Sequence, residues 1–373
     1  MNNAKGRFSV DISPDWQGFL RCLQRNGTPD RVFFIEFLLD EEIKSAVAAR
    51  FGLTADVEPD DPCYLKKREV RVQRFLGYDY VSCGVDHVGV KVDRLSVEDS
   101  AGLRRSGGRQ YLDLHQGPVT NWDQFNSYPW PKPNELTTDN LAWYQENLPE
   151  NMCIIGTGGF LHILELMGFE TLCYALHEQR DLVEAICRRL SELYQAAVEK
   201  MLRFDRVKAI FWADDMGFRS GTLIRPDDLR EFILPAHKKM AELARGAGRP
   251  YLLHSCGNLE AIMDDLLDDV RIDGLHSFED SIRTAEQIKQ KYGHRIAVLG
   301  GIDVDFLCRF DEEAIRRRVR STLEACQPGG GYCLGTGNSV TNYIPLDNYL
   351  VMLDEGRQFT QQRTMGKSVD NDC

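Results

Sequence analysis

A histidine and a cysteine, two positions apart, form the part of the sequence best suited to chemistry. His254 and Cys256 lie in the run Arg249-Pro-Tyr-Leu-Leu-His-Ser-Cys-Gly-Asn258, which predicts a buried strand over residues 251–256 that stops at the glycine. Side chains alternate between the faces of a strand, so this pair projects to one side at the strand's carboxyl end. An imidazole nitrogen beside a thiolate sulfur suits a zinc ion. The alternative is a core role, because free cysteines are often buried as small apolar side chains.

Acidic and amide side chains follow several other predicted strands. Glu36 interrupts the apolar run Arg31-Val-Phe-Phe-Ile-Glu-Phe37, and a buried carboxylate is costly unless it has a partner, which favours a functional role. Asp214 and Asp215 directly follow another predicted strand and are catalytic candidates, with capping of the next helix as the alternative. The candidates for binding a cofactor or substrate are Glu279, Asp303 and Asn338. A helix cap is the alternative role of Asp303.

The elements that position these residues form a regular series. Buried apolar runs predict strands that begin near residues 31, 78, 152, 208, 251, 272, 296 and 331, and each is followed by a helical pattern. Eight strand–helix units predict an α/β chain folded as a (β/α)8 TIM barrel. A doubly wound sheet is the alternative, but no Gly-x-Gly-x-x-Gly turn follows an early strand. In a barrel, the polar residues at the strand ends converge on one face.

The barrel supplies a third candidate ligand on the last predicted strand. Cys333 shares a strand face with Gly335, which leaves space above the thiol. Strands five and eight line the same barrel mouth, so Cys333 is expected to meet His254 and Cys256 there. Two thiolates and one imidazole leave one coordination position open, as in catalytic zinc sites. Cys83, which also ends a predicted strand, is the alternative third ligand.

The rest of the chain is interpreted as one barrel domain over residues 1–373 with additions. Residues 1–14 form an N-terminal extension, and residues 1–14 and 364–373 are predicted to be loose tails. Residues 86–150 are predicted to be an insertion after strand two, with a hairpin formed around Ser106-Gly-Gly108.

Charge and composition exclude several classes of partner. The chain has 373 residues, a formal net charge of −12 and 27% charged residues. An acidic surface disfavours nucleic acid and anionic membranes. No apolar run reaches the length of a membrane span, and the first residues lack the apolar core of a signal peptide, so a cytoplasmic location is expected. The 11 scattered cysteines do not predict a disulfide framework.

Three motifs resemble the uroporphyrinogen decarboxylase superfamily. They are His254-Ser-Cys-Gly-Asn258, Leu299-Gly-Gly-Ile-Asp303 and Cys333, and the resemblance covers most of the chain, most strongly residues 209–348. The most similar branch is the zinc-dependent, corrinoid-linked methyltransferases, which carry a His-x-Cys pair and a later cysteine as zinc ligands on a (β/α)8 barrel. The resemblance therefore implies zinc held by His254, Cys256 and Cys333.

The resemblance also implies a reaction and a partner. A methyl group is expected to pass from a methylated corrinoid, held on a corrinoid protein, to a thiol or similar small-molecule acceptor that zinc activates. Glu36 is expected to be a fourth ligand or a hydrogen-bond partner of a ligand. Asp214, Asp215 and Asn338 are expected to shape the acceptor pocket. The oligomeric state is not predicted.

Two other function classes remain open at this stage. The first is a uroporphyrinogen decarboxylase-like enzyme, but the stretch after the first strand, Glu36-Phe-Leu-Leu-Asp40, is acidic and apolar where decarboxylases carry arginines. The last strand also runs into Gly335-Thr-Gly337 where decarboxylases carry a Gly-His pair. The second class is a non-catalytic corrinoid-binding or metal-binding relative.

Overall fold

A curled, parallel sheet organises the protein. The structure is a computed structural model, and it describes residues 8–105, 108–112, 115–159 and 162–370. The main sheet has seven strands in the order β1-β4-β5-β8-β9-β10-β11, and every pairing in it is parallel. Their bounds are β1 Tyr80–Cys83, β4 Cys153–Gly159, β5 Val207–Ala213, β8 Tyr251–His254, β9 Gly274–His276, β10 Ala297–Leu299 and β11 Tyr332–Cys333. The strand order follows the chain without reversal, so the doubly wound alternative is excluded.

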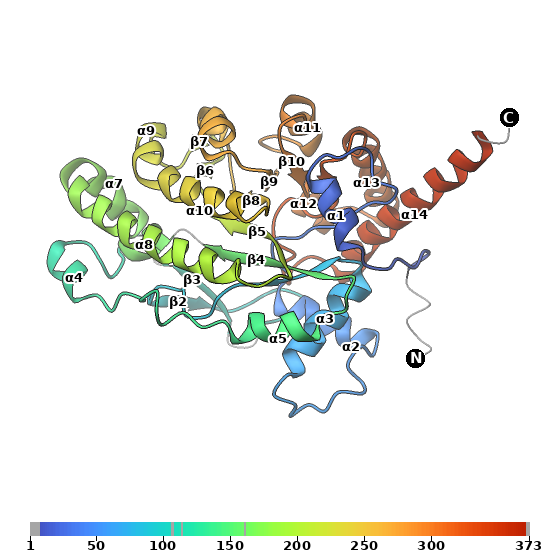
Figure 1. Ribbon diagram of the computed structural model, residues 1–373, viewed down its shortest axis with the longest axis horizontal. Helices are drawn as coiled ribbons and strands as arrows, with labels where there is room; N and C mark the ends of the chain where they lie inside the picture. Colours follow the sequence, from blue (N-terminus) through green and yellow to red (C-terminus); the bar gives the residue numbers. More distant parts are fainter. Residues whose placement is uncertain (1–7, 106–107, 113–114, 160–161, 371–373) are drawn as a thin grey trace.

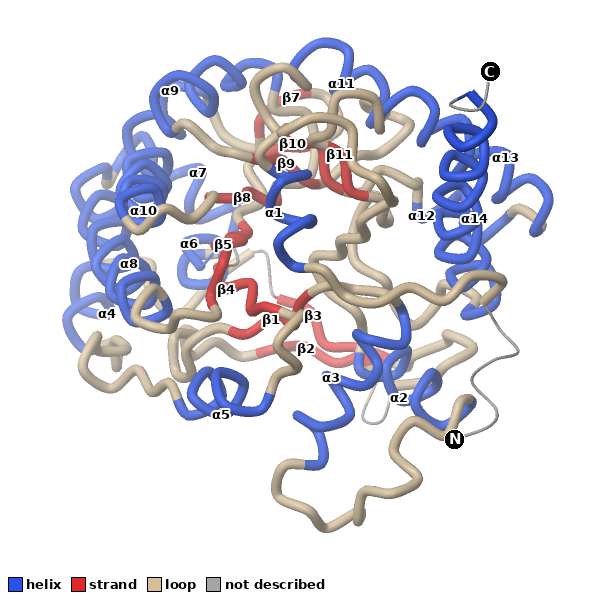
Figure 2. The backbone as a smooth tube through the Cα atoms, turned by 45° about the vertical axis from the view of Figure 1, so that its right-hand side comes forward, coloured by secondary structure: helices blue, strands red, loops and turns tan. Residues whose placement is uncertain are grey.

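Helices cover the outer face of this sheet, and the strands curl around the centre of the molecule (Figures 1 and 2). The α-helices are α1 Trp16–Leu23, α2 Glu41–Arg50, α3 Tyr64–Leu76, α4 Trp122–Ser127, α5 Asp139–Asn147, α6 His162–Met167, α7 Phe169–Glu178, α8 Arg180–Met201, α9 Pro226–Asp228, α10 Leu234–Gly246, α11 Ala285–Tyr292, α12 Val304–Arg309, α13 Glu312–Cys326 and α14 Leu346–Asp370. The π-helices are Leu229–Ile233 and Asp265–Val270, and Glu260–Ile262 is a 3-10 helix. The predicted α/β fold, of TIM-barrel-like form, is confirmed at this level.

The first predicted strand, residues 31–37, does not form a regular strand. Phe34 of this run makes an isolated parallel bridge to Leu334, and Leu39, two residues beyond the run, makes another to Val340. On the other side of the run, the backbone N–H and C=O of Glu36 both bond the hydroxyl of Tyr80, at 2.9 and 3.1 Å. A side chain of β1 therefore takes the place that a backbone ladder would occupy, and this part of the ring is joined by single contacts.

Helix α1 closes the amino-terminal end of the ring. Figure 2 shows it at the centre of the curled strands. Its Cys22 carbonyl accepts the N–H of Gly331, which precedes β11, and the N–H of Trp16 bonds Asn151, which precedes β4. We call this end the floor and the opposite, carboxyl end of the strands the mouth.

Parts of both predicted tails have defined contacts or regular structure. In the N-terminal arm, Ser9 bonds the carboxylate of Asp354 at 2.8 Å, and Arg357 stacks on Phe8, so residues 8–14 are held although they are irregular. Helix α14 continues to Asp370, beyond the predicted start of the tail at residue 364. Residues 1–7 and 371–373 of the predicted tails lie outside the described residues.

The segment between β1 and β4 contains the two predicted hairpin strands. They are β2 Arg94–Val97 and β3 Arg109–Leu112, which pair antiparallel. A third small sheet joins β6 Gly217–Phe218 to β7 Gly221–Thr222. Within the described part of the chain, no helix combines the length and the apolar character that crossing a bilayer requires.

Candidate metal centre

Three potential metal ligands converge at the mouth, from two neighbouring strands. His254 is the last residue of β8, Cys256 follows it by two residues, and Asp215 follows β5 by two residues. His254 Nε2 lies 3.5 Å from Asp215 Oδ1 and 3.6 Å from Cys256 Sγ. The ligand atoms of all three lie within 4.8 Å of one another. Imidazole, thiolate and carboxylate are the usual ligands of zinc in proteins.

The local backbone brings the loops after β5 and β8 into close contact. Gly257 has φ +84°, and a Cβ at this position would lie 2.2 Å from the backbone carbon of Gly217. Only glycine fits both the conformation and the space. The Cys256 N–H donates to Asp215 Oδ1 at 2.9 Å, which ties the two loops together at the cluster. The Gly257 that ends the predicted strand thus positions two candidate ligands.

His276, the last residue of β9, fixes the proton positions on His254. His276 Nε2 lies 3.1 Å from the backbone oxygen of Thr336, which can only accept, so Nε2 carries the proton. Burial lowers the pKa of His276 well below its usual value, and the charge of His254 acts in the same direction, so the ring is neutral and Nδ1 is an acceptor. His254 Nδ1, 2.7 Å away, must then be the donor. In a neutral His254 the lone pair of Nε2 therefore points at the cluster.

These proton positions leave the cluster able to bind a cation. Without a proton or a cation between them, the lone pairs of His254 Nε2, Asp215 Oδ1 and the Cys256 sulfur would face one another at close range. Burial and, to a lesser extent, the neighbouring Asp215 carboxylate together raise the pKa of Cys256 to about 12. Burial also acts to raise the pKa of Asp215, but the hydrogen bond and charge of His254 lower it. The S–H proton of the Cys256 thiol, a proton on Nε2 or a metal ion can each lie between these atoms, and the donor set fits zinc.

Three further side chains surround these ligands. The amide nitrogen of Asn338 lies 3.2 Å from Cys256 Sγ, and the hydroxyl of Ser277 lies 4.0 Å from it. The ring of Phe37 stacks on the imidazole of His254, with centroids 4.2 Å apart. The predicted site residue Asn338 is therefore brought to the cluster, and Asp215, predicted to be catalytic, is a candidate ligand.

The predicted third ligand, Cys333, lies elsewhere. Its thiol is fully buried and hydrogen-bonded to Cys22 of α1, on the floor. Burial raises the pKa of Cys333 well above its usual value, and the bond to Cys22 adds to this. Strand alternation predicts to which side of the strand the Cys333 side chain points. It does not predict how far Cys333 lies along the barrel axis from the mouth, where His254 and Cys256 lie. The structure therefore corrects the assignment of Cys333 as a ligand.

The alternative ligand, Cys83, is also separate from the cluster. It is 8% exposed at the end of β1, and its nearest polar contact is the oxygen of Gly84 at 3.5 Å. It lines a cavity of about 700 Å³ at the mouth together with Glu36, Phe37 and Lys66. We call this space the β1 cavity.

Asp214 and Asp215 point to opposite sides of their chain segment. Asp214 Oδ2 lies 3.1 Å from Nε2 of His237 in α10, which covers the outside of the sheet, and His237 also contacts the Tyr251 hydroxyl. Adjacent residues of an extended segment face opposite ways, so only one of the pair can reach the cluster. The structure does not support the predicted role of Asp214 in the acceptor pocket.

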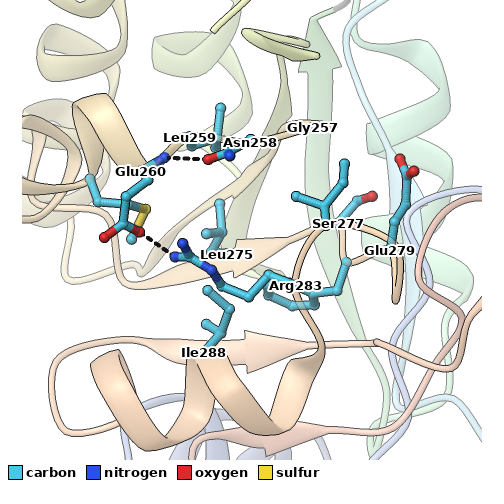
Figure 3. A pocket seen from close by; sticks show the side chains of 12 residues that line it. Gly257, Asn258, Leu259, Glu260, Leu275, Ser277, Glu279, Arg283 and Ile288 are labelled. Carbon is cyan, nitrogen blue, oxygen red and sulfur yellow. Dashed lines mark hydrogen bonds and ion pairs between the residues drawn. The ribbon is translucent and has the colours of Figure 1, made fainter. Parts of the chain in front are cut away.

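Asp303 and Glu279 are not among the converging ligands and line a groove beside Asn338. Asp303 caps α12 by accepting the N–H groups of Asp305 and Phe306, which confirms the helix-cap alternative. Figure 3 shows Glu279 on the opposite side of a small pocket from the Glu260–Arg283 ion pair. Glu279 also lines a groove of about 570 Å³ shared with Asn338. Their assignment to cofactor binding remains a prediction.

Glu36 is buried at the mouth but is not one of the converging ligands. It is 2% exposed, and its two carboxyl oxygens contact the backbone N–H and the hydroxyl of Thr336 at 2.9 and 2.6 Å. Burial raises the pKa of Glu36 to about 8, although the contacts with Thr336 act in the opposite direction. Glu36 does not belong to the cluster of candidate ligands among the described residues, so the structure does not support it as a fourth ligand. Its other predicted role, as a hydrogen-bond partner of a ligand, remains a prediction.

Four residues of this site were not predicted from the sequence: Phe37, His276, Ser277 and Thr336. His276 could have been found, because it ends a predicted strand next to the strand of His254 and carries a titratable ring. Thr336 offers no comparable signal. Its role depends on its backbone oxygen and on the packing of Glu36 against it.

Comparison with known families gives a match over most of the chain. The model of the uroporphyrinogen decarboxylase (URO-D) family matches residues 84–359. Among solved structures, a methyltransferase from Methanosarcina mazei superposes with a TM-score of 0.66 at 18% sequence identity, covering 93% of this chain and 99% of that chain. At this identity the likeness concerns the fold.

Two curated proteins are similar over shorter stretches. A methylated-thiol–coenzyme M methyltransferase of Methanosarcina mazei is 28% identical over 160 residues, which are 41% of this chain and 40% of the relative. The methylcobamide:CoM methyltransferase MtaA of Methanosarcina barkeri is 28% identical over 130 residues, 35% of this chain and 36% of the relative. The similarity thus spans about two fifths or less of these relatives.

Proposed function

Since this chain belongs to the uroporphyrinogen decarboxylase family, we propose that it is a zinc-dependent methyltransferase acting between a methylated corrinoid and a thiol. In this proposal the corrinoid is a co-substrate on a partner corrinoid protein, and the thiol is a small-molecule acceptor. The activities named for the two similar proteins, transfer from a methylated thiol or a methylcobamide to coenzyme M, support the reaction class.

The observation that carries the proposal is the convergence of Asp215, His254 and Cys256 on one point at the mouth. Three protein ligands leave a coordination position for a substrate, which distinguishes catalytic from structural zinc sites. When bound there, zinc supplies the positive charge that keeps an acceptor thiol deprotonated at neutral pH.

The surrounding residues hold and shield this ligand set. His276 keeps the Nδ1 proton of His254 directed away from the cluster, so Nε2 stays available as a ligand. The amide N–H of Asn338 donates to Cys256 Sγ, which stabilises the thiolate form that a metal requires. Phe37 covers one face of the His254 ring and keeps water from it.

The β1 cavity is the proposed site of the acceptor, because Phe37, which lines it, also packs on the ring of His254, so the cavity lies next to the candidate metal ligands. Among the described residues, Lys66 is the cation lining this cavity that has no carboxylate partner, because Lys44 and Arg68 are both ion-paired with Glu41. One cation without a carboxylate partner fits a small thiol with a single anionic group. A tetrapyrrole with several carboxylates needs more, so uroporphyrinogen decarboxylation is disfavoured.

Zinc content and methyl transfer test the proposal separately. Purified wild-type protein is expected to hold about one zinc per chain, and Cys256→Ser is expected to lose it. Methylcobalamin is then offered with coenzyme M, homocysteine or tetrahydrofolate, and transfer to a thiol is expected.

Each negative result has a defined meaning. Absence of zinc from the wild type, with activity retained in Cys256→Ser, contradicts the metal assignment. Zinc binding without transfer to any acceptor favours the non-catalytic alternative. Formation of coproporphyrinogen from uroporphyrinogen favours the decarboxylase alternative.

A further inference from the structure

The hydroxyl of Thr336 lies between two oxygen atoms that compete for its single proton. Its Oγ1 is 2.5 Å from the backbone oxygen of Asn338 and 2.6 Å from Oε2 of Glu36. A hydroxyl has one proton to donate, whereas a backbone carbonyl oxygen can only accept. The Thr336 proton therefore goes to Asn338, and the contact with Glu36 needs a proton from the glutamate.

We propose that Glu36 is a neutral carboxylic acid whose proton, donated to Thr336, positions the candidate metal ligands His254 and Cys256. The other carboxyl oxygen, Oε1, accepts the backbone N–H of Thr336 at 2.9 Å. Glu36 thus holds the amide and the hydroxyl of one residue at once, with the one donor and one acceptor that a protonated carboxyl offers.

The surroundings of Glu36 favour the neutral form. The side chain is buried, and desolvation disfavours the charged form, which is why its pKa rises to about 8. Its neighbours are the hydroxyls of Tyr78, Tyr80 and Tyr349, contributed by the residues around β1 and by α14. Among the described residues, no cation contributes to this pKa shift.

The charged groups nearby lie on the walls of the β1 cavity. They are Glu41, Lys44, Lys66, Arg68 and Glu69, with His162 as a further titratable group. Lys44 is ion-paired with both glutamates, and Arg68 with Glu41, so these pairs compensate one another. Glu36 is held by Thr336 and by Tyr80 and has no ion pair of its own among the described residues.

Thr336 transmits this contact to the first ligand. Its backbone oxygen accepts the Nε2 proton of His276 at 3.1 Å, and this leaves His276 Nδ1 to accept from His254 at 2.7 Å. A shift of Thr336 therefore changes the direction of the His254 lone pair.

Asn338 transmits it to the second ligand. Its backbone oxygen accepts the Thr336 hydroxyl proton, while its side-chain N–H donates to Cys256 Sγ at 3.2 Å. Glu36 touches neither ligand and is thus a positioning residue. Its effect on zinc rests on the proposed zinc centre, whereas its protonation does not.

The first test detects the proton on Glu36 directly. Infrared spectra of the full chain at pH 7 are expected to show the C=O stretch of a buried protonated carboxyl, which is lost in Glu36→Gln. The band is expected to titrate away above pH 8 in the wild type. Identical spectra of the two proteins in the carboxyl region contradict the proposal. This readout needs neither metal nor activity, so it stands even if the proposed methyltransferase function fails.

The second test measures the zinc dissociation constant of variants at pH 7. Gln reproduces the donor and acceptor of the neutral acid, so Glu36→Gln is expected to stay within about threefold of the wild type. Thr336→Val, which removes the hydroxyl, is expected to weaken zinc binding by about 10- to 100-fold, as for other partners of metal ligands. Thr336→Ser is the matched control and is expected to retain binding.

These outcomes separate a neutral acid from a charged one. Loss of zinc by Glu36→Gln, with folding unchanged by circular dichroism, means that the negative charge is required and overturns the proposal. Equal zinc affinity of Thr336→Val and Thr336→Ser also overturns it. In the wild type, zinc affinity is expected to fall as pH rises through about 8, because Glu36 loses its proton there. Glu36→Gln is expected to lack this fall, and the same fall in both proteins contradicts the assignment.

Discussion

Cys256 at the mouth and Cys333 on the floor are two strand cysteines of one curled sheet, with very different neighbours. Around Cys256, an imidazole lone pair, a carboxylate and an amide N–H converge within hydrogen-bonding range. Around Cys333, the nearest partner is a second thiol, that of Cys22, and the site is fully buried. The difference indicates that a strand cysteine is suited to be a ligand only where other potential ligand atoms converge on it.

The largest expected contrast is in zinc affinity between Cys256→Ser and Cys333→Ser. Loss of one of three ligands removes roughly a third of a binding free energy on the order of 10–16 kcal/mol, so Cys256→Ser is expected to weaken zinc binding by about 1000-fold. Cys333→Ser is expected to bind zinc like the wild type. Competition with a zinc-sensitive chelating dye measures both constants, and a similar loss in the two variants breaks the comparison.

A smaller effect is expected from His276, which contacts the candidate ligand His254 but is not itself one of the candidate ligands. His276→Leu removes the acceptor of the His254 Nδ1 proton, and zinc affinity is expected to fall by about 10- to 100-fold. His162→Phe is the matched control, because His162 is also buried but contacts Tyr194 and not the ligands. Equal zinc affinities of the two variants would show that the tautomer of His254 does not depend on His276.

The strands themselves were accessible to prediction from the sequence, whereas the level of each side chain in the ring was not. Apolar runs located the seven strands that form the sheet. The remaining predicted strand, residues 31–37 at the start of the series, does not pair with β1, because the Tyr80 hydroxyl bonds both backbone groups of Glu36. No local pattern predicts that long-range contact.

The candidate site divides in the same way. His254 and Cys256 were predictable from a short spacing on one strand, and Asp215 from its position after another. Cys333 was misplaced because alternation gives a direction and not a height along the axis. His276 and Thr336 act through hydrogen bonds between separate strands, and such bonds depend on register that the sequence does not show.

The two ends also differ in the titration of their aspartates. On the floor, burial raises the pKa of Asp79 to about 6, despite its ion pair with Arg31. The folded protein therefore holds this proton more tightly than the unfolded chain, and the free energy of unfolding falls as pH rises from about 4 to about 6. The fall due to this group is at most about 1.4 kcal/mol per pH unit.

Urea unfolding of the wild type and Asp79→Asn across this pH range measures the effect. The difference between their unfolding free energies is expected to change in favour of the variant as pH rises, since asparagine carries no titrating proton. A difference that is constant with pH would show that Asp79 titrates normally. Asp215 at the mouth is expected to behave oppositely, because its pKa is lowered.

The smallest effect is expected from the floor thiol pair. Cys333→Ala removes one small buried side chain and its contact with Cys22, so we expect a loss of about 1 kcal/mol in unfolding free energy. Cys22→Ala serves as the matched variant on the opposite side of the same contact. A loss of zinc in either variant would connect the floor to the metal centre and contradict its separate role.

X-ray absorption at the zinc edge tests the central claim most directly. The zinc-loaded wild type, in buffer free of thiols, is expected to show a single sulfur in the first coordination shell, from Cys256, with the remaining ligands nitrogen and oxygen. Cys256→Ser is expected to show none. Two sulfurs in the wild type, one of them lost in Cys333→Ser, would contradict the account.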